Sequence, residues 1–285
     1  MNIGFWNIES KPKKKNNKIF LKDLSDYMVM LTIERQLDII CLAETRDDIN
    51  LSFITKLNTI VRDSYSIIKC SKDKLTVISR YSNTSFEDKS HLYKSTRWTA
   101  HKLTIDSLIE LNLFAVHFHS KTSWSEASLA LECVNFARDI LVVEEQTKCK
   151  NTILIGDFNM NPFENGLVAA NGLNALSDLE YAIKTPKGRD IDGTFYEFFY
   201  NPMWSFFGDI NRQYGTYYYR TPGHISHEWN IYDQIIMRPR LKSYLDDPFL
   251  KIIKNIGGED ITKVFNRPDR EVYSDHLPVI LKLKF

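Results

Sequence analysis

Apolar residues along this chain recur at two different periods, and the changes between them predict a series of strands and helices. An apolar run at residues 2–8 indicates a strand, and apolar residues at helical spacing over residues 20–36 indicate a helix. The run at residues 37–43 indicates a buried strand, and a further helix is expected around residues 53–62. The chain therefore begins with a strand, a helix and a second strand.

The middle of the chain is rich in short β-like runs, which we expect to pair in antiparallel fashion. They lie at residues 65–69, 75–80, 98–105 and 109–119. A helical pattern follows at 126–144, and the later strands are predicted at 152–155, 229–237 and 278–285. Because we find neither an internal repeat nor a flexible linker, the pattern predicts one α+β domain over residues 1–285, with helices outside packed sheets.

The composition predicts a large hydrophobic core, and the cysteine spacing predicts reduced thiols. The chain has 285 residues, of which 43% are hydrophobic and 13% aromatic, which excludes a disordered tail or a small disulfide scaffold. Its cysteines form no C-x-x-C pair and are far apart, at Cys41, Cys70, Cys133 and Cys149. That spacing is typical of reduced thiols in a cytosol rather than of a zinc site or a secreted framework, and we interpret the cysteines as structural.

Charge is nearly balanced over the whole chain. Lys plus Arg number 37 and Asp plus Glu number 36, so the formal net charge is +1. Such a chain lacks the global positive field of a strongly basic nucleic-acid-binding domain, and any binding of phosphates must be local. Residues 1–8 are soon followed by the charged sequence KPKKK at residues 11–15, unlike a signal peptide, and no stretch reaches the roughly 18 apolar residues of a membrane span. We expect a cytoplasmic protein without membrane contact.

The most informative motif is GDFNMNP, which begins at Gly156. It follows a buried strand and presents a carboxylate and an amide two residues apart, so Asp157 and Asn159 point the same way while Phe158 points into the core. One side chain can hold a hard cation or a reacting proton, and the other can donate hydrogen bonds to a phosphate. The alternative is an Asx-rich turn that caps a helix starting near Pro162.

Polar side chains also stand at the ends of other predicted strands, where sites collect on α/β scaffolds. Asn7 ends the first strand and Glu44 follows the second. His117 and His119 end a later apolar strand and share one of its faces. Each of these has a structural alternative, namely a solvated or capping residue for the first pair and a half-buried histidine for the second.

Two acids and a histidine complete the set of candidates. Asp233 is embedded in an apolar strand, where an unpaired charge is costly to bury, so it needs a partner and a histidine would serve. Asp275 and His276, within the sequence YSDHLP, point to different sides of an extended chain. The acid could take a metal while the imidazole does proton or phosphate work. The alternative is a loop with one solvated acid and one half-buried histidine.

Taken in chain order, these motifs resemble the signature of the endonuclease/exonuclease/phosphatase superfamily, typified by deoxyribonuclease I and exonuclease III. The resemblance runs from Asn7 to His276 and depends most on GDFN and SDHLP, each flanked by predicted strands. It implies a four-layered α/β sandwich, in which two central, mostly antiparallel sheets flanked by helices bring the strand ends together at one rim. The chain departs from the pattern at Ala115, where the family often has asparagine.

The resemblance also implies a role for each motif residue. Metal binding falls to four oxygen-bearing side chains, which are Glu44, Asn7, Asp157 and Asp275. Catalysis falls to His276, Asp233, His117, Asp157 and Asn159. In this assignment Asp233 pairs with His276, and Asn159 also contacts the substrate. Oxygen ligands without clustered cysteines suit Mg²⁺ or Mn²⁺ rather than zinc.

The leading hypothesis is a metal-dependent nuclease for DNA or RNA, and the alternative is a phosphatase or phosphodiesterase for a small phosphorylated or lipid substrate. A non-catalytic scaffold is disfavoured because all the acids are present. Lys13, Lys14 and Lys15 are expected to hold the nucleic-acid backbone, with a solvated loop as the alternative. Tyr218 and Arg220, at the end of an aromatic-dense segment, are expected to contact bases, with core packing as the alternative. The sequence identifies no protein partner.

Overall fold

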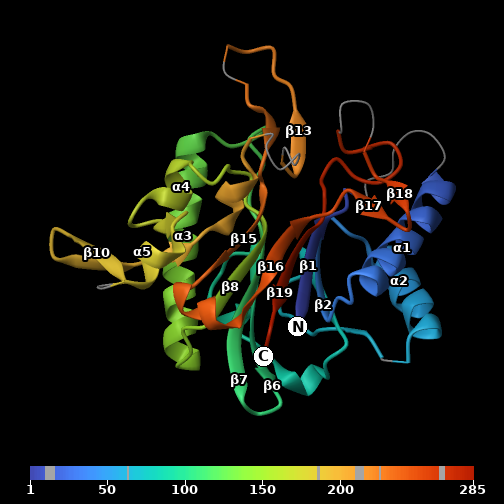
Figure 1. Cartoon of the computed structure of the whole chain (residues 1–285), viewed down its shortest axis with the longest axis horizontal. Helices are drawn as coiled ribbons and strands as arrows, with labels where there is room; N and C mark the ends of the chain where they lie inside the picture. Colours follow the sequence, from blue (N-terminus) through green and yellow to red (C-terminus); the bar gives the residue numbers. More distant parts are fainter. Residues whose placement is uncertain (10–16, 63, 185–186, 209–214, 225, 263–266) are drawn as a thin grey trace.

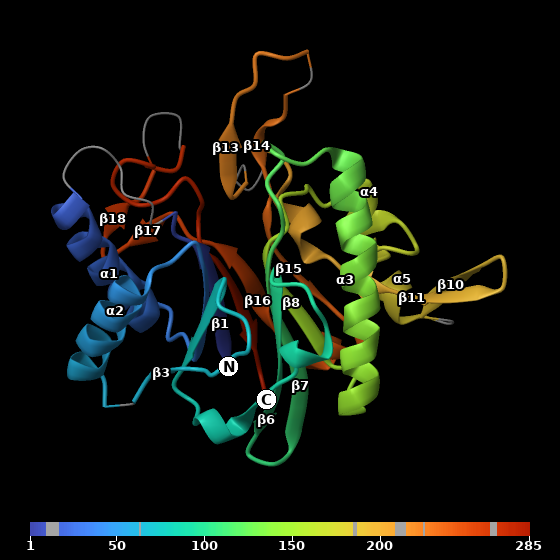
Figure 2. The same cartoon turned by 180° about the vertical axis from the view of Figure 1, so that it is seen from behind.

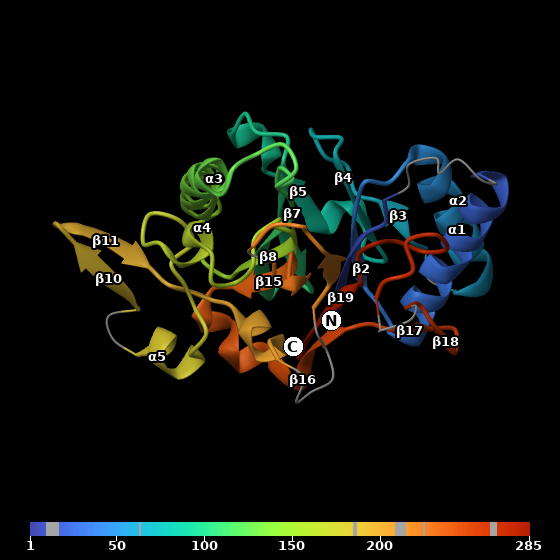
Figure 3. The same ribbon diagram turned by 90° about the horizontal axis from the view of Figure 1, so that it is seen from above.

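Two large sheets lie face to face in the centre of the molecule, and helices cover their outer faces (Figure 1). The computed structural model describes the chain except for residues 10–16, 63, 185–186, 209–214, 225 and 263–266. Seen from above in Figure 3, the two sheets lie between two pairs of helices. These are α1 (Asn17–Glu34) and α2 (Asp47–Ile60) on one side, and α3 (Glu126–Thr147) and α4 (Asn165–Val168) on the other.

Both sheets mix parallel and antiparallel pairs, and antiparallel pairs predominate. The first sheet has the strand order β16 (Leu245–Ile252), β19 (Val279–Leu283), β1 (Asn2–Asn7), β2 (Ile39–Ala43), β4 (Leu75–Ser79) and β3 (Ser66–Ile67). The second has the order β5 (Phe86–Asp88), β6 (Trp98–Ile105), β7 (Ile109–His117), β8 (Thr152–Asp157), β15 (Asp233–Met237), β12 (Phe199–Tyr200) and β9 (Ala175–Leu176). The predicted four-layered α/β sandwich is therefore confirmed.

Shorter elements decorate the ends of the two sheets. Three hairpins pair β10 (Gly188–Ile191) with β11 (Thr194–Glu197), β13 (Tyr217–Tyr219) with β14 (Glu228–Asn230), and β17 (Asn255–Ile256) with β18 (Glu259–Asp260). The remaining helical pieces are α5 (Leu179–Ile183) and the 3₁₀ turns η1 (Asn83–Ser85), η2 (Ser90–Leu92), η3 (Pro202–Phe206) and η4 (Pro239–Tyr244). The β13–β14 hairpin stands above one end of the sheets (Figure 2).

The central strands are buried on both faces, which explains their unbroken apolar sequences. On β8, Ile153 and Ile155 belong to the core between the two sheets, whereas Leu154 packs into the core beneath α3. On β7, Leu113 and Phe114 divide between the same two cores. Helix α3 begins where the side chain of its N-cap residue accepts a hydrogen bond from a backbone N–H one turn later. Tight packing on two faces holds the ends of β7 and β8 in place.

Most predicted elements occur close to their expected positions, with two corrections. The strand expected at 229–237 is two strands, β14 and β15, because the backbone between them leaves the hairpin to join β8, and the Phe158 N–H donates to the Tyr232 carbonyl. The helix expected at 53–62 begins six residues earlier, where Asp47 and Asp48 favour its first turn. Among the helices described, none is both long and apolar enough to cross a membrane.

Candidate active site

Strand directions bring the predicted site residues to one rim of the sandwich. β1 and β2 are parallel, with Asn7 in register with Ala43, so Asn7 and Glu44 lie at the same end of the first sheet. β7 and β8 are also parallel, and His117 is in register with Asp157 at the corresponding end of the second sheet. β15 runs the other way and begins opposite Asp157. The carboxyl ends of two parallel pairs and the start of an antiparallel strand therefore meet at one place.

A buried hydrogen bond joins the two sheets at this rim. Asn7 Nδ2 donates to Asp157 Oδ2 over 3.1 Å, and both side chains are buried. The Ser274 hydroxyl donates to the Asn7 carbonyl over 2.6 Å, and Trp6 Nε1 donates to the His276 carbonyl over 3.0 Å. The segment that carries His276 is thus fixed to the end of β1.

His276 and Asp233 form a buried pair. His276 Nδ1 lies 2.8 Å from Asp233 Oδ2, and the Asp233 N–H donates to the Thr216 hydroxyl over 3.0 Å. Burial alone would lower the pKa of His276, but the Asp233 and Asp157 carboxylates outweigh it and raise this pKa to about 10. The imidazole is therefore a cation at neutral pH in the metal-free protein.

Asp157 occupies the centre of the site, between two histidines. Its Oδ2 lies 4.0 Å from both His117 Nε2 and His276 Nε2, and its Oδ1 accepts the Asn159 N–H over 2.9 Å. Burial raises the pKa of this carboxyl group, because an ionised carboxylate loses its hydration there. Asn159 itself adopts a left-handed backbone with φ of 49° and donates through Nδ2 to the Phe118 carbonyl over 3.1 Å. The motif loop is thus rigidly tied to the end of β7.

His117 reaches across to the first sheet. Its Nε2 lies 3.5 Å from Glu44 Oε1, and Glu44 has a left-handed backbone with φ of 51°. Such a conformation is strained for a residue other than glycine and is concentrated at functional sites. His119 is directed elsewhere, because its Nδ1 lies 2.7 Å from Glu132 Oε1 and its ring stacks on Trp124 at 3.8 Å. Of the two histidines, it is His117 that faces the rim carboxylates of Glu44 and Asp157.

The donor set fits a hard divalent cation. Glu44, Asn7, Asp157 and Asp275 supply the oxygen ligands that hard cations prefer, and ligand atoms of Asp157, Asp233 and His276 lie within 4.8 Å of one another. Asp275 Oδ1 is buried and accepts no hydrogen bond from the part of the chain that is described. Burial raises the pKa of Asp275, with His276 opposing the effect. A bound cation would offset the cost of these buried carboxylates.

Of the predicted substrate contacts, Asn159 lies at this rim, whereas Tyr218 and Arg220 are directed elsewhere. Lys13, Lys14 and Lys15 lie outside the described residues. Tyr218 lies on the opposite face of β13 from Tyr217, and its hydroxyl donates to Glu228 Oε2 over 3.0 Å. Arg220 is exposed, and its Nε lies 3.7 Å from Glu228 Oε1. Alternation along β13 directs Tyr218 away from His276.

Sequence reasoning missed two residues beside the site. The Tyr217 ring lies 4.6 Å from the His276 imidazole, and a backbone bridge joins these two residues. Arg270 Nε lies 3.8 Å from Asp275 Oδ2, while its Nη2 lies 2.7 Å from Glu9 Oε1. Alternation along Tyr217–Tyr219 puts successive tyrosines on opposite faces, but the sequence does not say which face is turned toward the site. Nothing in the sequence pointed to Arg270.

A cleft opens beside the site, beneath the β13–β14 hairpin. It has a volume of about 690 Å³, and residues at its edges include Tyr232, Phe163, His227 and Lys121. The Tyr232 and Tyr217 rings stack at 5.3 Å, so a row of rings leads from the cleft to His276. Lys121 pairs with Glu164, and its Nζ lies 5.5 Å from the centre of the Tyr232 ring.

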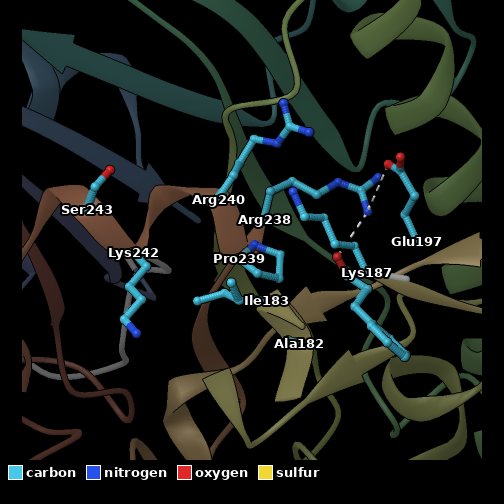
Figure 4. Close-up of a pocket in the computed structure, with 10 residues that line it drawn as sticks. Ala182, Ile183, Lys187, Glu197, Arg238, Pro239, Arg240, Lys242 and Ser243 are labelled. Carbon is cyan, nitrogen blue, oxygen red and sulfur yellow. Dashed lines mark hydrogen bonds and ion pairs between the residues drawn. The ribbon is translucent and has the colours of Figure 1, made fainter. Parts of the chain in front are cut away.

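A second pocket, of about 480 Å³, contains none of these residues (Figure 4). It lies where β15 ends, at the far end of that strand from Asp233. Its wall includes the buried Arg238, which pairs with Glu144 over 2.8 and 3.0 Å and packs over the Phe199 ring. Arg238 thus has a structural explanation there.

Comparison with known proteins places the whole chain in one family. Residues 4–276 match the model of the endonuclease/exonuclease/phosphatase family. No curated protein sequence matches the chain.

Solved structures share the fold at low sequence identity. A protein of this family from Leptotrichia buccalis C-1013-b is 16% identical, with a TM-score of 0.58 and complete coverage of both chains. TDP2 from D. rerio, complexed with single strand DNA product, is also 16% identical at a TM-score of 0.58, covering 100% of this chain and 99% of that one. The 3' phosphatase NExo from Neisseria, bound to a product DNA hairpin, is 14% identical at a TM-score of 0.52, with both chains fully covered. The chain therefore belongs to the endonuclease/exonuclease/phosphatase family, whose members hydrolyse phosphoric esters.

Proposed function

We propose that this protein is a divalent-metal-dependent phosphodiesterase that cleaves nucleic-acid strands. One observation carries the proposal: Asp157 accepts a hydrogen bond from Asn7 of the other sheet and lies 4.0 Å from Nε2 of both His117 and His276, beside a cleft. Hydrolysis of a phosphodiester requires that charge on the phosphoryl oxygens be neutralised, that a water be aligned and deprotonated, and that the leaving oxygen be stabilised.

The carboxylate cluster would hold the metal. Glu44, Asp275 and Asn7, with Asp157 next to them, offer the oxygen atoms that Mg²⁺ and Mn²⁺ prefer. When bound, the cation would supply positive charge to the phosphoryl oxygens. The chain's own residues must then position the phosphate and move the proton.

The two central groups divide the proton chemistry between them. His276 is kept protonated by Asp233, so it can donate to a phosphoryl oxygen and stabilise negative charge there. Asp157 has a raised pKa and is therefore a better proton acceptor than an exposed carboxylate, which suits it to deprotonate the attacking water. His117 and the second N–H of the Asn159 amide lie on either side of Asp157 and would contact the phosphate.

The cleft supports a nucleic-acid substrate over a small phosphomonoester. Its aromatic wall offers flat faces for bases, and stacking on aromatic rings is a common way to bind single strands. Lys121 at its edge is paired with Glu164, so the aromatic wall rather than a basic surface carries this preference. Two of the structures with this fold hold DNA products.

A substrate panel tests the proposal. Purified protein is incubated with single-stranded DNA, duplex DNA, RNA, an inositol phosphate and a phosphomonoester, in Mg²⁺, Mn²⁺ or EDTA. We expect cleavage of a polymer without release of phosphate, its loss in EDTA, and a decrease on the order of 10² or more in Asp157→Asn. Glu132→Gln, which alters a histidine–carboxylate pair outside the site, is the matched control and should keep its activity.

Other outcomes of the panel would contradict the proposal. Metal-dependent release of phosphate from the small substrates alone would identify a phosphatase. Full activity of Asp157→Asn would show that the site described above is not the catalytic one.

A further inference from the structure

The lateral edges of the two sheets meet at a small cluster of side chains far from the catalytic rim. β3 and β5 are edge strands of the first and second sheets. Cys70 follows β3, Asp88 ends β5, and His101 lies on β6 directly opposite Asp88. His101 is also in register with Leu113, which stands four residues before His117, so the cluster is on the order of 13 Å along the strand from the active site.

The three side chains are spaced for one metal ion. The Cys70 thiol, a carboxylate oxygen of Asp88 and a ring nitrogen of His101 all lie within 4.8 Å of one another. The distance from Cys70 Sγ to Asp88 Oδ1 is 3.8 Å. In a tetrahedral zinc site, metal–sulfur and metal–oxygen bonds of about 2.3 and 2.0 Å place such ligand atoms roughly 3.5 Å apart. Side-chain shifts of less than about 1 Å would therefore bring the three ligands to bonding distance, with a water in the fourth position.

His101 carries the second observation that points to a ligand. Its side chain is fully buried, and its Nε2 lies 3.2 Å from the Lys69 carbonyl, a contact that places the ring proton on Nε2. Nδ1 then presents a lone pair, yet it is buried and has no hydrogen-bond partner within the described chain. A buried acceptor without a donor is costly, whereas the same lone pair is a ligand for a metal.

Asp88 is oriented as a ligand. Its two carboxylate oxygens accept backbone N–H groups, Oδ2 from Ser71 over 2.7 Å and Oδ1 from Ser90 over 2.8 Å. Each oxygen keeps a further lone pair, so these bonds fix the carboxylate without exhausting it. One thiolate and one carboxylate would together neutralise a divalent cation.

We propose that Cys70, Asp88 and His101 form a structural Zn²⁺ site that clasps the edges of the two sheets. A thiolate and an imidazole select zinc over the Mg²⁺ or Mn²⁺ expected at the carboxylate-rich rim. Because the Cys70 segment belongs to the first sheet and the other two ligands to the second, the ion would join the sheets on the side where hairpin β3–β4 meets β5. The proposal is independent of the substrate that the active site takes.

Cobalt is the probe that tests this site. The purified chain is stripped with a chelator, saturated with Mg²⁺ to occupy the rim, and titrated with Co²⁺. We expect about one equivalent to produce a thiolate-to-cobalt charge-transfer absorption, and Zn²⁺ to remove it by displacement. In the same preparation, Zn²⁺ should raise the Tm by on the order of 5 °C when present at about a hundred times its Kd.

Matched variants locate the signal. Cys70→Ser should abolish the absorption and the Zn²⁺-dependent rise in Tm, and the isosteric Asp88→Asn should weaken both. Cys149→Ser is the control, because that thiol donates to the Glu110 carbonyl and does not belong to the cluster. Asp157→Asn should also keep the signal, since it alters the rim alone. Circular dichroism establishes that each variant is folded, and Asp88→Asn replaces Cys70→Ser if the latter is not.

The proposal would be overturned by either of two results. One is the absence of a charge-transfer band in the wild-type chain, and the other is a band that persists in Cys70→Ser. Loss of the band in Asp157→Asn would likewise show that the signal does not come from an independent site at the sheet edges. None of these outcomes depends on hydrolytic activity, so the failure of this inference and that of the proposed function are distinguishable.

Discussion

The buried pair of Asp233 and His276 offers the sharpest test of the site, through the substitution Asp233→Asn. Asparagine has nearly the same shape and its side-chain oxygen can still accept the His276 Nδ1–H, which now spans 2.8 Å to Asp233 Oδ2. The substitution therefore removes a charge while keeping the hydrogen bond. What changes is the protonation of His276.

The size of the effect follows from the environment of the imidazole. Asp233 is the largest of the carboxylate influences that raise the pKa of His276 to about 10, against a burial effect that lowers it. An opposite charge at this distance shifts a pKa by about 1 to 3, so the variant should titrate between about pH 7 and 9. At pH 9 the wild-type imidazole stays mostly protonated, whereas a variant that titrates near pH 8 keeps the imidazolium in roughly one molecule in ten, so the rate at pH 9 should decrease by about tenfold.

Stability should change with pH in a defined direction. The pKa of His276 in the folded protein is raised above its ordinary value of 6.5 to about 10. Stabilisation by the imidazolium is therefore fully present below pH 6.5 and is lost as the pH rises through 10. In EDTA, the free energy of unfolding should differ between wild type and Asp233→Asn by about 3 kcal/mol at pH 6.5, and the two should converge at high pH.

Two measurements check this reasoning. NMR titration of the histidine ring protons in EDTA gives the pKa of His276 directly, and oligonucleotide cleavage in Mg²⁺ gives the rate. Glu132→Gln alters an equivalent pair with His119, and it should leave the pKa of His276 and the cleavage rate unchanged. An Asp233→Asn variant that keeps its rate within about threefold, or a His276 that still titrates near 10, would refute the reasoning.

Three further predictions concern the scaffold and the metal. Gly156→Ala should destabilise the protein by about 1 to 3 kcal/mol and lower activity, because the new Cβ would lie 2.0 Å from the Val116 carbonyl oxygen, between the strands that carry His117 and Asp157; urea unfolding measures it. Arg238→Met should cost about 3 to 5 kcal/mol by leaving Glu144 buried without its partner, while the kcat of the folded fraction stays unchanged. Mg²⁺ at a hundred times its Kd should stabilise the wild type by about 2.7 kcal/mol and so raise its Tm. Asp275→Asn should show a smaller rise in Tm, and equal rises in the two proteins would contradict a role for Asp275.

The fold could be predicted because its strands are unusually clear in the sequence. β6 and β7 were expected from runs of apolar and β-branched residues that start where the strands do, at Trp98 and Ile109. Burial on both faces removes alternation but leaves dense apolar runs, which length and flanking residues still identify as strands. The break between β14 and β15 could not be seen, because the residues across it are as apolar as those of a continuous strand.

The site could be predicted only where it stands on regular strands. Asn7, His117 and Asp157 terminate strands whose parallel pairing brings their ends together. Their proximity could therefore be inferred from the order of the motifs along the chain. Tyr217 and Arg270 reach the rim from a hairpin and an irregular segment, whose approach depends on contacts made after the sheets have packed. The cluster at Cys70 was not predicted for the same reason, because the spacing of residues along the chain does not indicate that the edges of two sheets come into contact.

The hydrogen bond between Asn7 and Asp157 also indicates at which stage of folding the active site forms. It joins residues 150 positions apart, and His276 arrives from a strand-flanking segment more than a hundred residues later still. Contacts of such sequence separation form late, after the loops between them have closed. A chain still under synthesis has the N-terminal acids of the site but still lacks His276. Hydrolytic competence should therefore appear all at once with the final folding step, and a single backbone cut that releases the last strand should abolish it.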